Sequence, residues 1–217
     1  MQSLKLYRSS RLKNYLRKKN PEAAGSFVLK HLCNPEFPLY YVLRNFNWLQ
    51  REKWWKALSP RSRRVHAARL LHDRVGVFSA VKRWKKIRSD WLQEQHAIPI
   101  KTDKAPGYCN KCGLCCEVSS GMPDFPKSCE LPDEWRDLFG NGLGQGHRFC
   151  PFLWEDQGSG GSLCSIYPWR SNPCRLFDSE ECDFFRDSTE PAEISSDRNL
   201  LLMTRWLATR VSIRKPH

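Results

Sequence analysis

Nine of the ten cysteines in this 217-residue chain lie between Cys109 and Cys182. The densest group is Cys109, Cys112, Cys115 and Cys116, in which the first three follow at steps of three residues. A C-x₂-C turn lets two thiolates reach one metal while the backbone between them donates hydrogen bonds to sulfur. Three cysteines at this spacing, with a fourth from elsewhere, are also typical of a cubane iron–sulfur cluster. The pattern therefore predicts a thiolate metal centre, and inert buried thiols are a poor explanation for it.

The neighbouring pair Cys115 and Cys116 suggests more than one role for the cysteines. Side chains of adjacent residues point in different directions, so binding of both to one mononuclear ion would strain the backbone. Either one of the two is a spare or reactive thiol, or the pair serves two centres. Further thiols follow in the sequence at Cys129, Cys150, Cys164, Cys174 and Cys182. Eight ligands would suffice for two four-coordinate sites, and thiolate-rich sites accept both iron and zinc.

Three segments together resemble a known family. They are Cys109-x₂-Cys112-x₂-Cys115-Cys116, then Cys150-Pro-Phe-Leu153, then Cys164-Ser-Ile-Tyr-Pro-Trp-Arg-Ser-Asn-Pro-Cys174-Arg-Leu-Phe177. Over residues 106–182 the chain resembles the YkgJ-type zinc- or iron-chelating cysteine-cluster (CxxCxxCC) family. It departs from the family pattern after Arg170, where Ser171-Asn172-Pro173 replaces an Arg-Pro step.

The resemblance implies a small metal-binding module, often described as carrying an iron–sulfur cluster, so the expected cofactor is iron–sulfur (4Fe–4S) or zinc. Cys182 is kept among the predicted ligands although no motif element contains it. The predicted metal ligands are Cys109, Cys112, Cys115, Cys116, Cys150, Cys164, Cys174 and Cys182.

Charge changes where cysteine content changes. Residues 1–108 hold 24 Lys/Arg against 7 Asp/Glu, a net of +17, whereas residues 109–217 hold 12 against 16, a net of −4; together they give the +13 of the whole chain. Two properties that change together favour separate modules. We expect a basic helical module at 1–105, a cysteine-cluster module at 106–185 and a C-terminal helix at 186–217.

Elements that would position the cysteines can be predicted from periodicity and turn residues. The expected helices lie at 4–19, 22–33, 45–58, from Ser59-Pro60 to about 71–75 with Gly76 as the cap, at 77–96, briefly from 131 until Gly140, and at 197–211. Residues 148–154 and 163–167 predict a hairpin around a Gly/Ser-rich loop. The expected class is α+β, mostly helical at the N-terminal side, with short strands in the cysteine-cluster module.

The basic half suggests a partner. The bases in question run along two predicted helices and are interleaved with tryptophans: Arg61, Arg63, Arg64, Arg69, Arg74, Lys82, Arg83, Lys85, Lys86 and Arg88. Such a surface attracts nucleic acid or an acidic protein. Two alternatives are a membrane surface and a merely solvated face over a tryptophan core.

No run of residues is long and apolar enough for a membrane span, and no signal-peptide block is present, so we expect a cytoplasmic protein, with organelle import left open. There is no phosphate loop, nucleophile elbow or H-E-x-x-H. The predicted function is an iron–sulfur or zinc-binding cysteine-cluster protein, a redox or structural metal centre with a basic docking module. The alternatives are a zinc-stabilised adaptor or RNA-binding protein without redox chemistry, and a cluster-dependent enzyme acting on RNA or protein.

Overall fold

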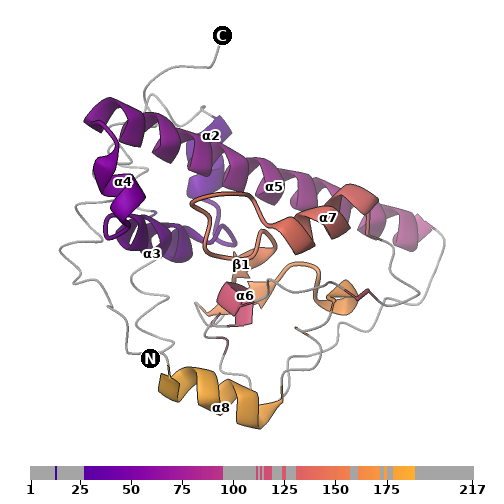
Figure 1. Ribbon diagram of the computed structural model, residues 1–217. Coiled ribbons are helices and arrows are strands. Elements are labelled where there is room, and N and C mark those ends of the chain that lie inside the picture. The colour runs from indigo at the N-terminus through magenta and orange to yellow at the C-terminus, as the bar shows by residue number, and fades with distance from the viewer. Residues whose placement is uncertain are drawn as a thin grey trace.

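The computed structural model of the chain describes residues 13, 27–94, 111, 113, 115–118, 124–125, 131–156, 161–171, 174 and 178–188. Helices dominate, and two short strands form one antiparallel sheet, which confirms the α+β class (Figure 1). The helices are α2 (Phe27–Leu32), α3 (Leu39–Leu49), α4 (Lys53–Ala57), α5 (Pro60–Glu94), α6 (Cys115–Val118), α7 (Asp133–Asn141), the 3₁₀ helix η2 (Tyr167–Trp169) and α8 (Ser179–Ser188); the strands are β1 (Leu153–Glu155) and β2 (Ser162–Cys164).

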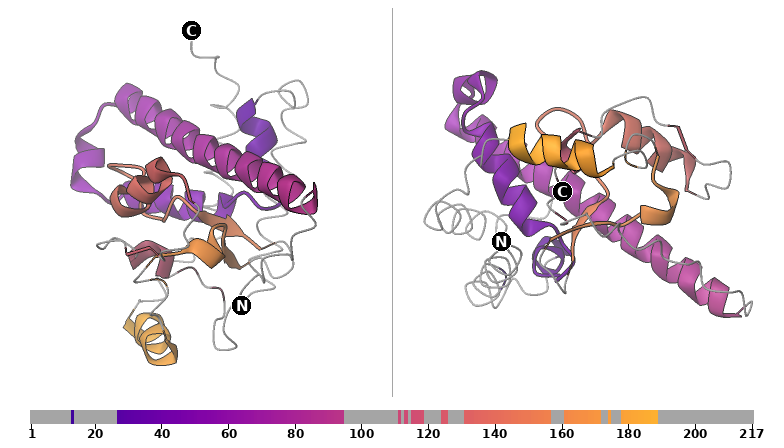
Figure 2. Two further views of the ribbon diagram at one scale, coloured as in Figure 1. Left: turned by 90° about the vertical axis from the view of Figure 1, so that its right-hand side faces the viewer. Right: turned by 90° about the horizontal axis from the view of Figure 1, so that it is seen from below.

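The longest element is α5, which runs the length of the molecule (Figure 2). Its start agrees with the sequence, because the Ser59 hydroxyl accepts a hydrogen bond from the Ser62 amide at 3.1 Å. The expected break at Gly76 is wrong. Val75 and Phe78 are buried on either side of Gly76, which itself lies on the exposed face. Burial of this face outweighs the cost of about 1 kcal/mol for a glycine inside a helix.

The single helix expected at 45–58 is two helices. α3 ends at Leu49, α4 begins at Lys53, and the Glu52 amide donates to the Leu49 carbonyl in the turn between them at 3.1 Å. The turn changes the chain direction so that Trp55, like Leu49, is buried. Periodicity does not reveal such a break, because aromatic residues continue through it.

The expected hairpin is confirmed. Leu153 of β1 faces Cys164 of β2, and Glu155 faces Ser162. α7 continues past the expected stop at Gly140 and ends at Asn141, where Gly142 takes a left-handed φ of 65°. The expected helix at 197–211, and that at 4–19 apart from Lys13, lie outside the described residues. In the described part of the chain no helix could cross a membrane.

One hydrophobic core takes residues from both sides of the charge boundary. Phe78 of α5 packs against Phe37 and against Trp154 of β1, with ring centroids 5.2 and 4.9 Å apart. Trp84 of α5 contacts Trp135 of α7 at 5.4 Å. The basic helices and the hairpin thus bury each other. The predicted boundary near residue 105 lies outside the described residues, and the division into three modules stays a prediction.

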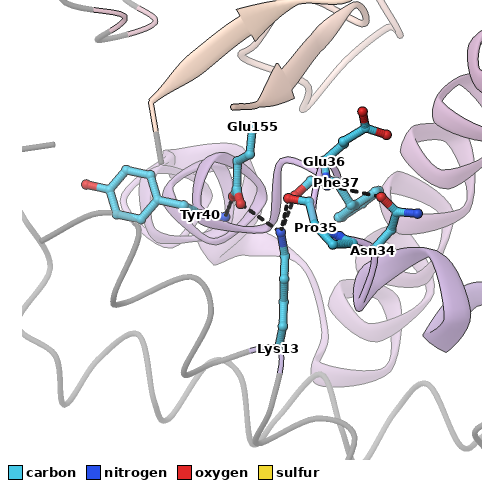
Figure 3. A network of polar contacts seen from close by, with 7 residues as sticks. All are labelled: Lys13, Asn34, Pro35, Glu36, Phe37, Tyr40 and Glu155. Carbon is cyan, nitrogen blue, oxygen red and sulfur yellow. Dashed lines mark hydrogen bonds and ion pairs between the residues drawn. The ribbon is translucent and has the colours of Figure 1, made fainter. Parts of the chain in front are cut away.

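A buried ion pair ties three distant segments together (Figure 3). Lys13 Nζ lies 2.7 Å from Glu155 Oε2, and both side chains are almost fully buried. Lys13 also donates to the carbonyls of Pro35 and Phe37 at 2.9 Å, while Glu155 Oε1 accepts from the Tyr40 amide at 2.9 Å. Every charge in this pair is therefore matched by hydrogen bonds, as a buried pair requires.

Candidate thiolate metal centre

The cysteine-rich turn around residue 113 is fixed to both α3 and the hairpin. Gly113 has a φ of +83°, and a β-carbon there would lie 2.8 Å from Cε1 of Tyr41. Lys111 also takes a positive φ, its carbonyl accepts a hydrogen bond from the Ser162 amide at 2.6 Å, and its ammonium group pairs with Asp156. Only glycine suits position 113, because both the backbone conformation and the closeness of Tyr41 exclude a side chain.

The described thiols enter the site from several separate parts of the chain. Cys115 and Cys116 begin α6, directly after the turn. The Cys150 amide donates to the Cys116 carbonyl at 2.7 Å, which places the residue preceding the hairpin beside α6. Cys164 ends β2, and Cys174 follows η2. None of the described cysteines forms a disulfide.

The neighbouring side chains of Cys115 and Cys116 form a hydrogen bond with each other. Their mutual hydrogen bond lowers the pKa of Cys115 to about 7, against burial, with further help from Arg170 and from the backbone amides of residues 115 and 116. The same hydrogen bond, together with burial and the charges of Cys115, Cys150 and Cys164, raises the pKa of Cys116 well above its usual value. Cys115 is thus the readiest thiolate of this pair.

The pKa values of the other thiols are raised by burial and by one another. Burial, and then the charge of Cys150, raises the pKa of Cys164, while the Ile166 amide and Arg170 lower it. Burial, then Cys150 and Cys115, raises the pKa of Cys174 to about 12. A bound cation would reverse this effect and favour the thiolates.

A buried guanidinium completes the site. Arg74 of α5 is 4% exposed, and its Nη1 donates to the carbonyls of Phe149 and Cys150 at 3.2 and 2.6 Å. Its Nη2 has no hydrogen-bond partner among the described residues. Burial lowers the pKa of Arg74 to about 10, and the charges of Cys150 and Cys116 raise it. Among the described residues no carboxylate pairs with Arg74, so thiolates are the anions available to this cation.

Arg170 also faces the thiols. Its guanidinium stacks over the Tyr167 ring at 3.9 Å, and its charge lowers the pKa of Cys115, Cys164 and Cys174. Stacking on an aromatic ring holds a guanidinium in place and leaves its charge intact. Two cations, Arg74 and Arg170, would therefore compensate the negative charge of these sulfurs when a bound metal makes them thiolates.

Five of the eight predicted ligands influence one another's pKa: Cys115, Cys116, Cys150, Cys164 and Cys174. Cys182 lies in α8, and Cys109 and Cys112 lie outside the described residues. Within the described ranges no three His, Cys, Asp or Glu side chains are placed so that they could hold a metal ion. The charge effects reach farther than a single coordination shell, so the two observations are compatible. The donor set, all thiol with amide and guanidinium neighbours, fits iron or zinc.

The sequence pattern places Arg74 on the exposed basic surface, but the structure shows it buried beside the thiols. A signal was present, because Arg74 shares its helix face with the apolar positions Leu70, Leu71 and Phe78. The tryptophans expected to stack on bases also face inward: Trp55 is buried, and Trp84 packs on Trp135.

A cavity of about 20 Å³ lies beside Arg74, between α3 and residues 147–149. It has room for little more than one water molecule and offers no space for a substrate. His147 lines it, and burial, followed by the charge of Arg74, lowers the pKa of His147 to about 4. Comparison with known proteins gives no match to the chain among family models, curated proteins or solved structures.

Proposed function

We propose that the protein binds a metal centre, an iron–sulfur cluster or zinc, through its cysteine cluster, and that the centre serves a redox or structural role. The observation that supports the proposal is that the charges of two thiols from separate segments, Cys116 and Cys150, act on a buried guanidinium that has no carboxylate partner among the described residues. A buried cation needs an anion, and thiolates stabilised by a metal supply it. Cys109 and Cys112 would add two ligands from the same turn.

The C-x₂-C-x₂-C sequence pattern supports a cluster as one form of the centre, because three cysteines at this spacing with a fourth thiol from elsewhere are typical of a cubane iron–sulfur cluster. When bound, such a cluster would supply electron transfer or redox sensing. The chain's own groups would orient it, with Ile166 donating an amide hydrogen bond and Arg74 and Arg170 balancing its charge.

The basic helices give the centre a docking role. Exposed bases on α4 and α5 support an anionic partner, nucleic acid or an acidic protein. Cysteines outside disulfides are typical of a reducing compartment, and we therefore propose a cytoplasmic location. A zinc-stabilised adaptor without redox chemistry differs in its metal from the iron–sulfur form of this proposal, so identification of the metal separates the two.

The proposal is tested by anaerobic purification followed by iron, zinc and acid-labile sulfide analysis and a visible spectrum. We expect iron and sulfide in comparable amounts and a brown colour that bleaches on reduction. Zinc at one or two equivalents without colour would favour the adaptor. Protein that carries neither metal after anaerobic handling would contradict the proposal.

Two cysteine variants show whether metal binding depends on the proposed ligands. Cys164→Ala removes a thiol of the cluster, whereas Cys33→Ala removes a buried thiol whose hydrogen bond goes to the Lys13 carbonyl. Both changes delete one buried sulfur. We expect Cys164→Ala to lose most of the metal and Cys33→Ala to retain it. Equal metal content in both variants would show that Cys164 is not a ligand of the centre.

A further inference from the structure

The outward face of α5 carries a row of exposed bases. Its inward face is formed by Ala67, Leu70, Val75 and Phe78, all buried. Of the exposed basic side chains on the rest of the helix surface, five are here called the basic strip: Arg61, Arg64, Arg69, Arg83 and Lys86. At 1.5 Å per residue the basic strip extends over about 38 Å.

The charge of the basic strip is almost unbalanced within residues 60–87. The one acid in this stretch is Asp73, which is half-buried and lies 3.8 Å from Arg69 and 3.6 Å from His147. Four other bases of α5 interact with groups of the protein itself, and two of them, Lys82 and Lys85, are exposed. Arg63 caps α4 through the Trp55 carbonyl, Arg74 is buried, Lys82 pairs with Glu36, and Lys85 lies over the Trp154 ring.

The surface around the basic strip has too few exposed apolar side chains to bind a membrane. It also does not favour stacking of aromatic rings on the bases of single-stranded nucleic acid. The large apolar side chains exposed on the described part of α5 are Val65 and Ile87, too few for an interfacial face. Stacking on unpaired bases needs accessible aromatic rings, and Trp84 of α5 packs against Trp135 and Trp169. A partner that offers phosphates alone fits better.

We propose that the basic strip binds the phosphates of double-stranded DNA, with α5 placed at the major groove. This deepens the docking role proposed above and rests on it. The length of the strip is close to one helical turn of B-form DNA, about 34–36 Å. The B-form major groove admits an α-helix, whereas the deep, narrow major groove of A-form RNA does not. Between the two ends of the basic strip, the exposed residues of α5 include the small Ala68 and Gly76 and the larger Val65 and His72.

The test measures binding of the full-length protein to a fluorescent 24-base-pair DNA duplex by anisotropy, at several salt concentrations. Each phosphate contact contributes about −0.9 to the slope of log K against log salt, so the five strip bases predict a slope of about −4 to −5. Arg83→Gln/Lys86→Gln should reduce the slope by about two and weaken binding about tenfold at low salt. Arg148→Gln, which removes a charge stacked on Trp48 of α3, should leave the slope unchanged.

Several results would overturn the proposal. These are absence of binding at low salt, variants of the basic strip that bind like the wild type, tighter binding to an RNA duplex of the same sequence, and binding to vesicles with anionic lipid in place of DNA. Metal content is measured on the same samples. If the protein contains metal but does not bind DNA, only the proposed DNA binding by the basic strip is refuted. If the protein binds DNA but contains no metal, only the proposed metal centre is refuted.

Discussion

At the scale of single residues, the site depends on charges placed where water does not reach. Arg74 could have been compensated by an acid, but within the described part of the chain the groups near its charge are thiols, the His147 imidazole and the carbonyls of Phe149 and Cys150. An unneutralised buried guanidinium is costly. This cost is offset if Cys116 and Cys150 are thiolates on a metal, so the cation and the metal centre stabilise each other.

Replacement of Arg74 tests this dependence. Arg74→Leu should lower the metal content of purified protein by more than half and destabilise the fold by about 2–4 kcal/mol, because two carbonyls lose their donor and the thiolates lose their cation. Arg74→Lys should keep most of the metal, since it keeps the charge. Arg69→Leu, on the exposed side of α5, should change neither. Equal metal loading of Arg74→Leu and Arg74→Lys would reduce Arg74 to a packing role.

His147 makes folding sensitive to acid. Its folded pKa is about 4, against about 6.5 when unfolded, so below pH 6.5 the unfolded chain takes up a proton that the folded protein refuses. Stability is therefore lost as pH falls from about 6.5 to 4. Between pH 7 and pH 5 we expect the wild type to lose about 1–2 kcal/mol more than His147→Gln in anaerobic urea unfolding. Identical losses would show that His147 titrates normally.

At the scale of elements, the cysteine turn depends on α3 for its position. Gly113 has a left-handed φ and lies against Tyr41. Gly142 has a left-handed φ of 65°, but a β-carbon there would meet none of the described residues within 4 Å. Comparison of the two glycines therefore separates the cost of backbone strain from the cost of steric contact with Tyr41.

Alanine at these glycines should therefore have unequal effects. Gly142→Ala should cost about 1 kcal/mol, the strain of a left-handed alanine. Gly113→Ala should cost about 2–4 kcal/mol and displace the turn, with loss of metal, because Tyr41 must also move. The measurement is the free energy of unfolding and the metal content of both variants. A Gly113→Ala protein as stable as Gly142→Ala would contradict the packing of the turn on α3.

Helices and strands could be predicted from the sequence where local residue patterns determine them. Where the structure differs from the prediction, the difference has a physical cause. The Ser59 cap and the hairpin were predicted because a capping residue, and two apolar runs around a Gly/Ser-rich loop, are local signals. The continuation of α5 through Gly76 was missed because tertiary burial of Val75 and Phe78 outweighs a local helix breaker. The cysteine spacing indicated the donor set, but no local pattern announces that Arg74 lies beside Cys150.

At the scale of the whole molecule, segments distant in sequence stabilise one another. Lys13, Glu155 and the turn before α3 form a single buried network (Figure 3). The hairpin that carries Cys164 is thus anchored to the N-terminal half through Glu155. A charge boundary in the sequence does not prevent a shared core, because the core is formed by the apolar faces.

Two ion pairs of similar geometry should contribute differently to the free energy of unfolding. Lys13→Met leaves Glu155 buried without its cation and should destabilise the protein by about 3–5 kcal/mol. Lys82→Met breaks the exposed pair with Glu36, 2.9 Å apart, and should cost less than about 1 kcal/mol. Equilibrium unfolding of both variants checks the difference. Comparable costs would mean that the Lys13 network contributes no more than a surface pair.

The most direct test of the metal centre is X-ray absorption at the iron and zinc edges of anaerobically purified protein. We expect a first shell of sulfur at about 2.3 Å, with metal–metal scattering if the centre is a cluster. In Cys164→Ala this sulfur signal should fall, and in Cys33→Ala it should not. A first shell of nitrogen and oxygen, or no bound metal, would contradict the assignment of Cys115, Cys116, Cys150, Cys164 and Cys174 to a thiolate metal centre.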